Sequence, residues 1–196
     1  MFDNIRSNLL GVMNTRKNPI IREALEWIVH IGFAVIVGLT IVTFIAQITI
    51  VYGNSMQPTL QPYNFLVVEK LTPRFGELKA GDIVTLNVPE YVGKEKSTIV
   101  KRVIAVEGDV FEIKNGMVYV NNKALEEGYI MGSYTQEVNP QYAALVIPED
   151  HIYVLGDNRL PNASLDSRSI GAIAKGKIGG KVILRIFPFN EFGKIY

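Results

Sequence analysis

The strongest constraint in the sequence is an uncharged apolar run from Trp27 to Val51. It contains no Asp, Glu, Lys or Arg, and a helix that crosses the hydrocarbon core of a bilayer needs about 20 such residues. A cleavable leader would have a shorter apolar core and a small-x-small exit, whereas the exit FIAQITIVYG offers no A-x-A motif. The run therefore predicts a single transmembrane helix over residues 27–51.

Basic residues on the N-terminal side of this run predict its orientation. Loops rich in Lys and Arg remain in the cytoplasm, while a folded domain crosses the membrane largely regardless of its own charge. We expect a single-pass protein of the plasma membrane, with residues 1–26 in the cytoplasm and residues 52–196 outside. The basic residues before the run are Arg6, Arg16, Lys17 and Arg22.

The overall composition excludes several classes of function. The formal net charge is +1, so the chain lacks the positive field of a nucleic-acid-binding protein. There is no Cys and there are only two His, of which His30 lies inside the apolar run. A thiol nucleophile is therefore excluded, and a zinc site built from several His is not expected. We expect neither a metal nor another cofactor.

Beyond Val51 the sequence changes to short segments rich in β-branched and aromatic residues, such as 64–71, 82–88 and 97–108. Such segments are typical of strands. The pair Asn115-Gly116 separates two of them, which predicts a tight hairpin. We expect a mainly β domain of antiparallel strands, in which residues 109–149 form a small β cap.

One serine, Ser55, lies directly after the apolar run, in the stretch YGNSMQPTLQP. Gly53 permits a positive φ and Pro58 stiffens the exit of the turn. Such a turn can present a hydroxyl and a backbone N–H to one point, as acyl transfer requires. An isolated serine in this setting is ordinarily a turn or capping residue, so its interpretation depends on a base.

Lys101 is the candidate base, with His151 as the only His outside the apolar run. Alternation along TIVKRVIAV places Lys101 on the same face as Ile99, Val103 and Ala105. Burial on an apolar face lowers the pKa of a lysine, which suits a general base. Alternation does not choose between Lys101 and its neighbour Arg102, but arginine does not deprotonate in proteins. The alternative is a strand-edge lysine whose amine reaches solvent.

The loop GDNRLPNASLDSRSIG, residues 156–171, alternates acidic and basic residues among small polar ones. Internal ion pairs could fix such a loop, although a solvated connection has the same composition. Ser164 or Ser167 could accept hydrogen bonds from a neutral lysine and orient it. The charged residues of the loop are Asp157, Arg159, Asp166 and Arg168.

Taken in order, GNSMQPTL, GDIVTLNVPE, KRVIAVEGD and GDNRLPNASLDSR resemble the sequence boxes of type I signal peptidases (leader peptidases), in their Gram-positive-like branch. Their order, their spacing and the single N-terminal anchor make the resemblance specific, and it extends to about Phe187. It implies an antiparallel β catalytic core with a smaller β cap. It also implies a serine endopeptidase that removes signal peptides from exported preproteins with small residues one and three positions before the cut.

The resemblance further implies roles for individual residues. Ser55 matches the nucleophile and one backbone oxyanion donor, Lys101 matches the general base, and Ser164 matches the serine that orients the lysine. Two features depart from the family. Gly53 stands where some members carry a serine whose hydroxyl is the second oxyanion donor, so the second donor of this chain is not assigned. The spacing between GDNR and Ser164 is also longer than usual. Met56, Ile99 and Val100 match positions of the substrate groove, and supporting positions are Gly53, Pro58, Thr59, Leu60, Arg102, Asp157, Asp166 and Arg168.

Two other functions fit part of the sequence. A self-cleaving Ser/Lys protease of the SOS-repressor type would carry a DNA-binding helical domain and no membrane anchor. A membrane-tethered pseudopeptidase would bind signal peptides without cutting them, but the presence of both Ser55 and Lys101 speaks against it. We therefore expect preproteins and the lipid bilayer as partners, and neither nucleic acid nor metal.

Overall fold

The computed structural model describes residues 19–93 and 98–195. The chain divides between Thr43 and Phe44 into two compact units. The first contains helix α2 (Pro19–Thr40), and a π-helical turn, η1 (Ile41–Ile45), continues across the division. The remaining helices are short: α3 (Thr72–Phe75), α4 (Pro89–Val92), η3 (Pro140–Tyr142), α5 (Ser167–Ile170), η4 (Lys175–Lys177) and η5 (Phe189–Glu191).

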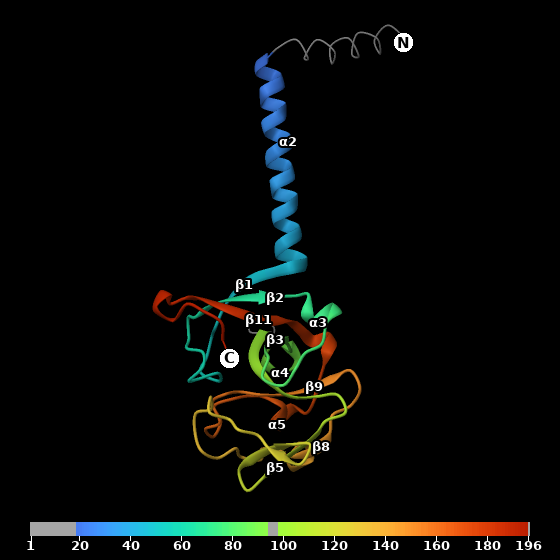
Figure 1. Ribbon diagram of the computed structural model, residues 1–196, viewed down its shortest axis with the longest axis vertical. Helices are drawn as coiled ribbons and strands as arrows, with labels where there is room; N and C mark the ends of the chain where they lie inside the picture. Colours follow the sequence, from blue (N-terminus) through green and yellow to red (C-terminus); the bar gives the residue numbers. More distant parts are fainter. Residues whose placement is uncertain (1–18, 94–97, 196) are drawn as a thin grey trace. The chain divides into compact units, whose positions relative to one another are not determined.

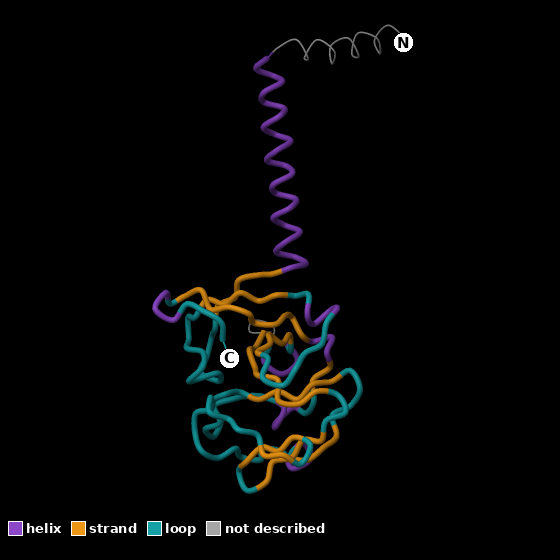
Figure 2. The backbone as a smooth tube through the Cα atoms, viewed as in Figure 1, coloured by secondary structure: helices purple, strands orange, loops and turns teal. Residues whose placement is uncertain are grey.

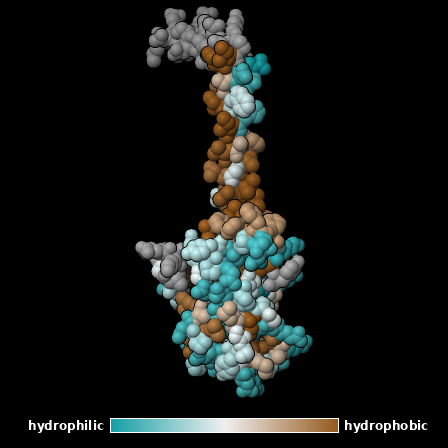
Figure 3. Space-filling model, turned by 90° about the vertical axis from the view of Figure 1, so that its left-hand side faces the viewer, coloured by the Kyte–Doolittle hydropathy of each residue, from teal (hydrophilic) through white to brown (hydrophobic). Residues whose placement is uncertain are grey.

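Helix α2 and the turn after it are long and apolar enough to cross a membrane. The candidate span runs from Ile20 to Ile45, and none of it is buried inside the structure. Figure 3 shows a mainly apolar surface along the helix. The helix begins earlier than expected, at Pro19. In its first turns Arg22 and Glu26 form an ion pair one turn apart. The expected cytoplasmic segment before Pro19 lies outside the described residues.

The expected helix over 27–51 is wrong at its C-terminal end. Residues Ala46–Ile50 form strand β1, which pairs with strand β2 (Phe65–Glu69) in antiparallel register. An apolar run of this kind does not itself distinguish helix from strand. The β-branched residues of ITI fit a pleated surface, and β2 supplies a partner for the strand.

All strand pairs between the named strands are antiparallel. A seven-stranded sheet has the order β1-β2-β11-β3-β4-β9-β10, and most of these strands are labelled in Figure 1. The mainly β expectation is therefore confirmed. The further strands of this sheet are β3 (Ile83–Asn87), β4 (Thr98–Val106), β9 (His151–Leu155), β10 (Ile173–Ala174) and β11 (Ile178–Phe187).

A second, four-stranded sheet has the order β7-β6-β5-β8. In Figures 1 and 2, β5 and β8 lie at the end of the β domain opposite β1 and β2. Its strands are β5 (Val110–Lys114), β6 (Met117–Val120), β7 (Lys123–Ala124) and β8 (Ala144–Val146). Asn115 and Gly116, with φ of 51° and 77°, make the tight turn between β5 and β6, so the hairpin prediction is confirmed.

The two sheets share a hydrophobic core. Ile104 and Ala105 of β4 pack in one buried cluster with Phe111 and Ile113 of β5. A shift of register between Val103 and Ala105, where β4 pairs with β9, produces this arrangement. Because the bulge interrupts the alternation, Ala105 does not lie with Val103 as expected, and Val103 belongs to a different cluster.

Candidate active site

Ser55 lies in a tight turn between β1 and β2. The N–H of Gln57 donates to the carbonyl of Asn54 at 3.1 Å, and the N–H of Leu60 donates to the carbonyl of Met56 at 2.9 Å. Gly53 precedes the turn with a φ of +93°, a conformation that side chains with a Cβ rarely adopt. The backbone conformation at position 53 therefore favours glycine over the residue that serves as second oxyanion donor in some family members.

The hydroxyl of Ser55 meets the amine of Lys101. Lys101 Nζ lies 2.7 Å from Ser55 Oγ, and it also donates to the carbonyl of Val100 at 2.8 Å. Ser55 is half-buried, whereas Lys101 is only 2% exposed. A loop serine and a strand lysine from distant parts of the sequence are thus in direct hydrogen-bonding contact.

The environment of Lys101 favours the neutral amine. Burial lowers the pKa of Lys101 to about 8, while the carboxylates of Asp166 and Asp157 act in the opposite direction. No carboxylate pairs directly with Lys101 among the described residues. Desolvation without a paired anion is the condition that turns a lysine into a base near neutral pH.

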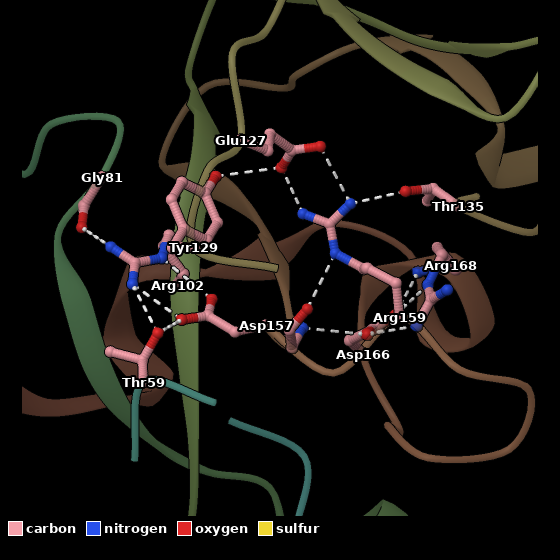
Figure 4. Close-up of polar contacts among 11 residues, drawn as sticks. Thr59, Gly81, Arg102, Glu127, Tyr129, Thr135, Asp157, Arg159, Asp166 and Arg168 are labelled. Atoms are coloured by element: carbon pink, nitrogen blue, oxygen red, sulfur yellow. Dashed lines mark hydrogen bonds and ion pairs between the residues drawn. The ribbon is translucent and has the colours of Figure 1, made fainter. Parts of the chain in front are cut away.

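Arg102, the next residue of β4, lies in a different environment (Figure 4). Its Nε and Nη2 donate to the two carboxylate oxygens of Asp157 at 2.9 and 2.7 Å. Nη1 donates to the carbonyl of Gly81 at 3.0 Å, and the guanidinium lies 4.0 Å above the ring of Tyr129. Thr59 Oγ1 donates to Asp157 at 2.5 Å. This buried ion pair therefore joins β4 to the loops that carry the serine.

A second buried ion pair extends this network toward the four-stranded sheet. Arg159 pairs with Glu127, and it donates to the carbonyl of Gly156 at 2.8 Å and to Thr135 Oγ1 at 2.6 Å. Tyr129 donates to Glu127 at 2.9 Å (Figure 4). Nothing in the local sequence pointed to Glu127, Tyr129 or Thr135, because their partners are distant in the chain. Arg159 did stand out in the charged loop.

Gly156 allows the two serine-bearing segments to come together. A Cβ placed on Gly156 would lie 2.5 Å from the carbonyl oxygen of Ser55 and 2.3 Å from Ser164 Oγ, closer than real Cβ contacts allow. Ser164 therefore packs against the glycine that touches the nucleophile turn. Its Oγ is buried without a hydrogen-bond partner among the described residues, so the expected hydrogen bond from Ser164 to Lys101 is not present, and Lys101 contacts Ser55 and the Val100 carbonyl instead. The hydroxyl lies near enough to Asp166 to help lower the pKa of that group.

Asp166 and Arg168 fix the end of the same loop. They form a buried ion pair of 2.8 Å, and Asp166 also accepts the N–H of Gly156 at 3.0 Å. Burial opposes the ionisation of Asp166, but Arg168 outweighs it and holds the pKa of Asp166 below its usual range. The ionised carboxylate thus holds Gly156 in place behind Ser55.

Asn158 is a contact that sequence reasoning missed. Its side-chain amide donates to the carbonyl of Asn54 at 3.1 Å, and its backbone N–H donates to the carbonyl of Ser55 at 3.0 Å. Isolated bridges join Met131 to Asn158 and Ile130 to Pro58. The segment Ile130–Met131, which follows strand β7 of the four-stranded sheet, therefore contacts both the Ser55 turn and the loop that begins at Gly156. The one sequence signal for a role of Asn158 was its place in the polar loop of residues 156–171.

The expected substrate-groove residues occupy different positions. Met56 is 1% exposed and Val100 packs partly buried against the same cluster. Ile99 is half-buried against another cluster. Ile99 and Val100 thus extend from opposite faces of β4, next to Lys101. Their contact with a substrate stays a prediction.

The alternative base, His151, lies at the start of β9. Its Nδ1 lies 2.7 Å from the carbonyl of Glu149, whereas the hydroxyl of Ser55 contacts Lys101. Within residues 19–93 and 98–195, no three His, Cys, Asp or Glu side chains gather into a group that could hold a metal ion. The arrangement offers a hydroxyl nucleophile and an amine base.

Comparison with known proteins connects this geometry to one family. Residues 24–187 match the family model described as signal peptidase, peptidase S26. The chain is 33% identical over 175 residues to signal peptidase I of Leptolyngbya laminosa, covering 87% of this chain and 83% of that protein. It is 37% identical over 180 residues to signal peptidase I P of Bacillus subtilis subsp. natto, covering 87% and 92%.

A crystal structure of a signal peptidase I from Enterococcus faecalis covers 54% of this chain and 96% of its own, with 27% identity and a TM-score of 0.45. Members of this family are serine proteases anchored in membranes, and the apolar span Ile20–Ile45 fits such an anchor. On the family match and the curated relatives, the chain belongs to the signal peptidases of peptidase family S26.

Proposed function

We propose that this chain is a membrane-anchored endopeptidase that cleaves signal peptides from exported preproteins, with Ser55 as nucleophile and Lys101 as general base. The observation that carries the proposal is the 2.7 Å contact between Ser55 Oγ and a lysine amine whose pKa is lowered by burial. A serine hydroxyl needs a neighbouring base to become a nucleophile, and at this site the base is an amine.

In the first half of the reaction, Ser55 Oγ attacks the carbonyl carbon of the scissile peptide bond while neutral Lys101 takes the hydroxyl proton. The negative charge on the carbonyl oxygen is stabilised by the N–H of Ser55. Collapse of this intermediate breaks the C–N bond, and the Lys101 ammonium protonates the departing amine of the mature protein. The signal peptide remains as an ester on Ser55.

In the second half, Lys101 takes a proton from a water molecule as the water attacks the ester carbonyl. The intermediate collapses, the C–O bond to Ser55 breaks, and Lys101 returns the proton to Oγ. The signal peptide leaves with a new carboxylate. The Arg102–Asp157 and Arg168–Asp166 ion pairs hold the loops. Ser164, which packs against Gly156, would position Lys101 once its hydroxyl turns toward the amine.

We place the substrate as an extended peptide beside β4, where Ile99 and Val100 flank Lys101. An added strand is held by backbone hydrogen bonds, and pockets for alternate side chains select the sequence. Small residues one and three positions before the cut would fit such pockets. The N-terminus would face the cytoplasm and the β domain would lie outside the plasma membrane, with residues 109–149 as its cap.

The test is cleavage of a purified preprotein by the full chain in detergent micelles, beside Ser55→Ala and Lys101→Ala. Each substitution should abolish turnover, because the nucleophile and its base act as one unit. Addition of EDTA should leave the rate unchanged. Full activity in either variant would refute the assignment, and binding without cleavage by the unaltered chain would identify a pseudopeptidase.

A further inference from the structure

A cleft of about 730 Å³ lies beside α3, and neither Ser55 nor Lys101 lines it. Gln47 of β1, Asn87 of β3 and Lys175 of η4 contribute to its wall, together with Lys70 and Arg74 from the turn around α3. Its size is that of a small-molecule site. The catalytic chemistry proposed above leaves this cleft unexplained.

Two of its cationic residues are attached to the end of the apolar span. The backbone N–H of Lys70 donates to the carbonyl of Ile45, the last residue of the span, at 2.8 Å. Arg74 Nη1 donates to the carbonyl of Phe44 at 3.1 Å, and its guanidinium lies 5.9 Å from the centre of the Phe44 ring. Lys70 and Arg74 are therefore held beside Ile45 and Phe44, the residues at which the apolar span ends.

The same turn exposes apolar side chains between its cations. Leu71 is 44% exposed and Phe75 is 84% exposed, and they alternate along KLTPRF with Lys70 and Arg74. Exposed aromatic and aliphatic side chains interspersed with Lys and Arg are typical of protein surfaces that enter the boundary between headgroups and acyl chains. The composition of this turn therefore suits the membrane interface.

The charges of the cleft favour an anion. Lys70, Arg74 and Lys175 are cationic, and Asp150 is the acidic residue among the lining side chains. Lys175 forms an exposed ion pair of 2.7 Å with Glu107, whereas Lys70 and Arg74 hydrogen-bond to Ile45 and Phe44 at the end of the span. An arginine guanidinium can donate two parallel hydrogen bonds to a phosphate.

We propose that this cleft binds the phosphodiester headgroup of an anionic phospholipid at the outer face of the anchor, with Arg74 and Lys70 holding the phosphate and Leu71 and Phe75 entering the acyl boundary. Anionic lipid is favoured over zwitterionic lipid by about fivefold for each nearby cation. The inference rests on the proposed membrane anchoring and requires no part of the cleavage chemistry.

The test uses the full chain in non-ionic detergent micelles, with native mass spectrometry to count the lipids that remain bound. Dioleoylphosphatidylglycerol is titrated against dioleoylphosphatidylcholine, which has the same acyl chains and phosphate but no net charge. The unaltered chain should retain phosphatidylglycerol preferentially. Lys70→Gln/Arg74→Gln should weaken its apparent affinity by roughly 30-fold, as two cations are lost.

The matched control is Lys114→Gln/Lys123→Gln, which removes two charges from exposed positions of the four-stranded sheet and should leave lipid retention unchanged. Circular dichroism confirms that each variant is folded. Equal retention of both lipids or undiminished retention by Lys70→Gln/Arg74→Gln would overturn the proposal. Preprotein cleavage measured in parallel separates failure of the peptidase assignment from failure of the lipid site.

Discussion

Lys101 and Arg102 are consecutive cations on one strand, both almost completely buried, yet their environments differ fundamentally. The Arg102 guanidinium has a carboxylate, a carbonyl and an aromatic ring as partners. Lys101 has a hydroxyl and a carbonyl, and the nearest carboxylates act on it only at longer range. The comparison teaches that a buried arginine paired with a carboxylate is a fixed structural charge, whereas a buried lysine without a paired anion is a titratable base.

The largest expected effect comes from Lys101→Met, which replaces the amine by an apolar group of similar length. Turnover should fall by about 10⁴-fold or more, because no group remains to take the Ser55 proton. The melting temperature should stay the same or rise, since a buried amine without a paired anion is removed. Cleavage assays and thermal unfolding followed by circular dichroism measure the two effects. A large loss of stability would show that Lys101 is a structural residue.

Asp157→Asn should mainly reduce stability, in contrast to Lys101→Met, because it leaves Arg102 buried without its anion. Breaking a buried ion pair costs roughly 3–5 kcal/mol, which for a domain of this size lowers the melting temperature by about 6–20 °C. Arg102→Met combined with Asp157→Leu should recover much of that loss. An unchanged melting temperature in Asp157→Asn would mean that the Arg102 side of β4 does not stabilise the fold.

Gly156→Ala tests the contact between the two serine-bearing loops. The added Cβ would meet the Ser55 carbonyl and the Ser164 side chain, and a displacement of about 1 Å at a nucleophile can cost about 10²-fold in rate. Gly128→Ala is the matched control, because a Cβ there would meet nothing within 4 Å. Equal kcat values for the two variants would argue against close packing behind Ser55.

Ser164→Ala should have the smallest effect. Among the described residues the hydroxyl has no hydrogen-bond partner, so its removal should not lower the melting temperature. If the hydroxyl turns toward Lys101 during the reaction, as the resemblance to signal peptidases implies, its loss should reduce kcat by about tenfold. The pH dependence of kcat distinguishes orientation from proton transfer, because the ascending limb should keep its position. An unaltered kcat would show that Ser164 does not orient Lys101 and that the Val100 carbonyl is sufficient to position it.

The sequence predicted the parts of this structure that depend on local patterns. Strand content, the Asn115–Gly116 hairpin and the burial of Lys101 follow from alternation and turn chemistry. Strand β1 was missed because its apolar residues continue the membrane run and its strand partner, β2, lies beyond the serine turn. Ala105 was misplaced because a bulge in β4 depends on pairing with β9.

The nucleophile and the base of the candidate site could be predicted, because few residue types can carry out these two roles. With no Cys and only His151 outside the apolar run, Ser55 and Lys101 were favoured, and the resemblance to type I signal peptidases implied the same two residues. The supporting contacts were not predictable, since Asn158 reaches Asn54 and Glu127 reaches Arg159 across long stretches of chain. Such pairs are set by the folded topology and leave no local pattern.

The pH dependence of kcat/KM for preprotein cleavage tests the central claim most directly. Lys101 must be neutral to accept the Ser55 proton, and burial places its pKa at about 8. The rate should therefore rise about tenfold per pH unit below pH 8 and level off above it. An ascending limb near the ordinary histidine value of about 6.5 or the ordinary lysine value of about 10.4 would contradict a buried lysine base.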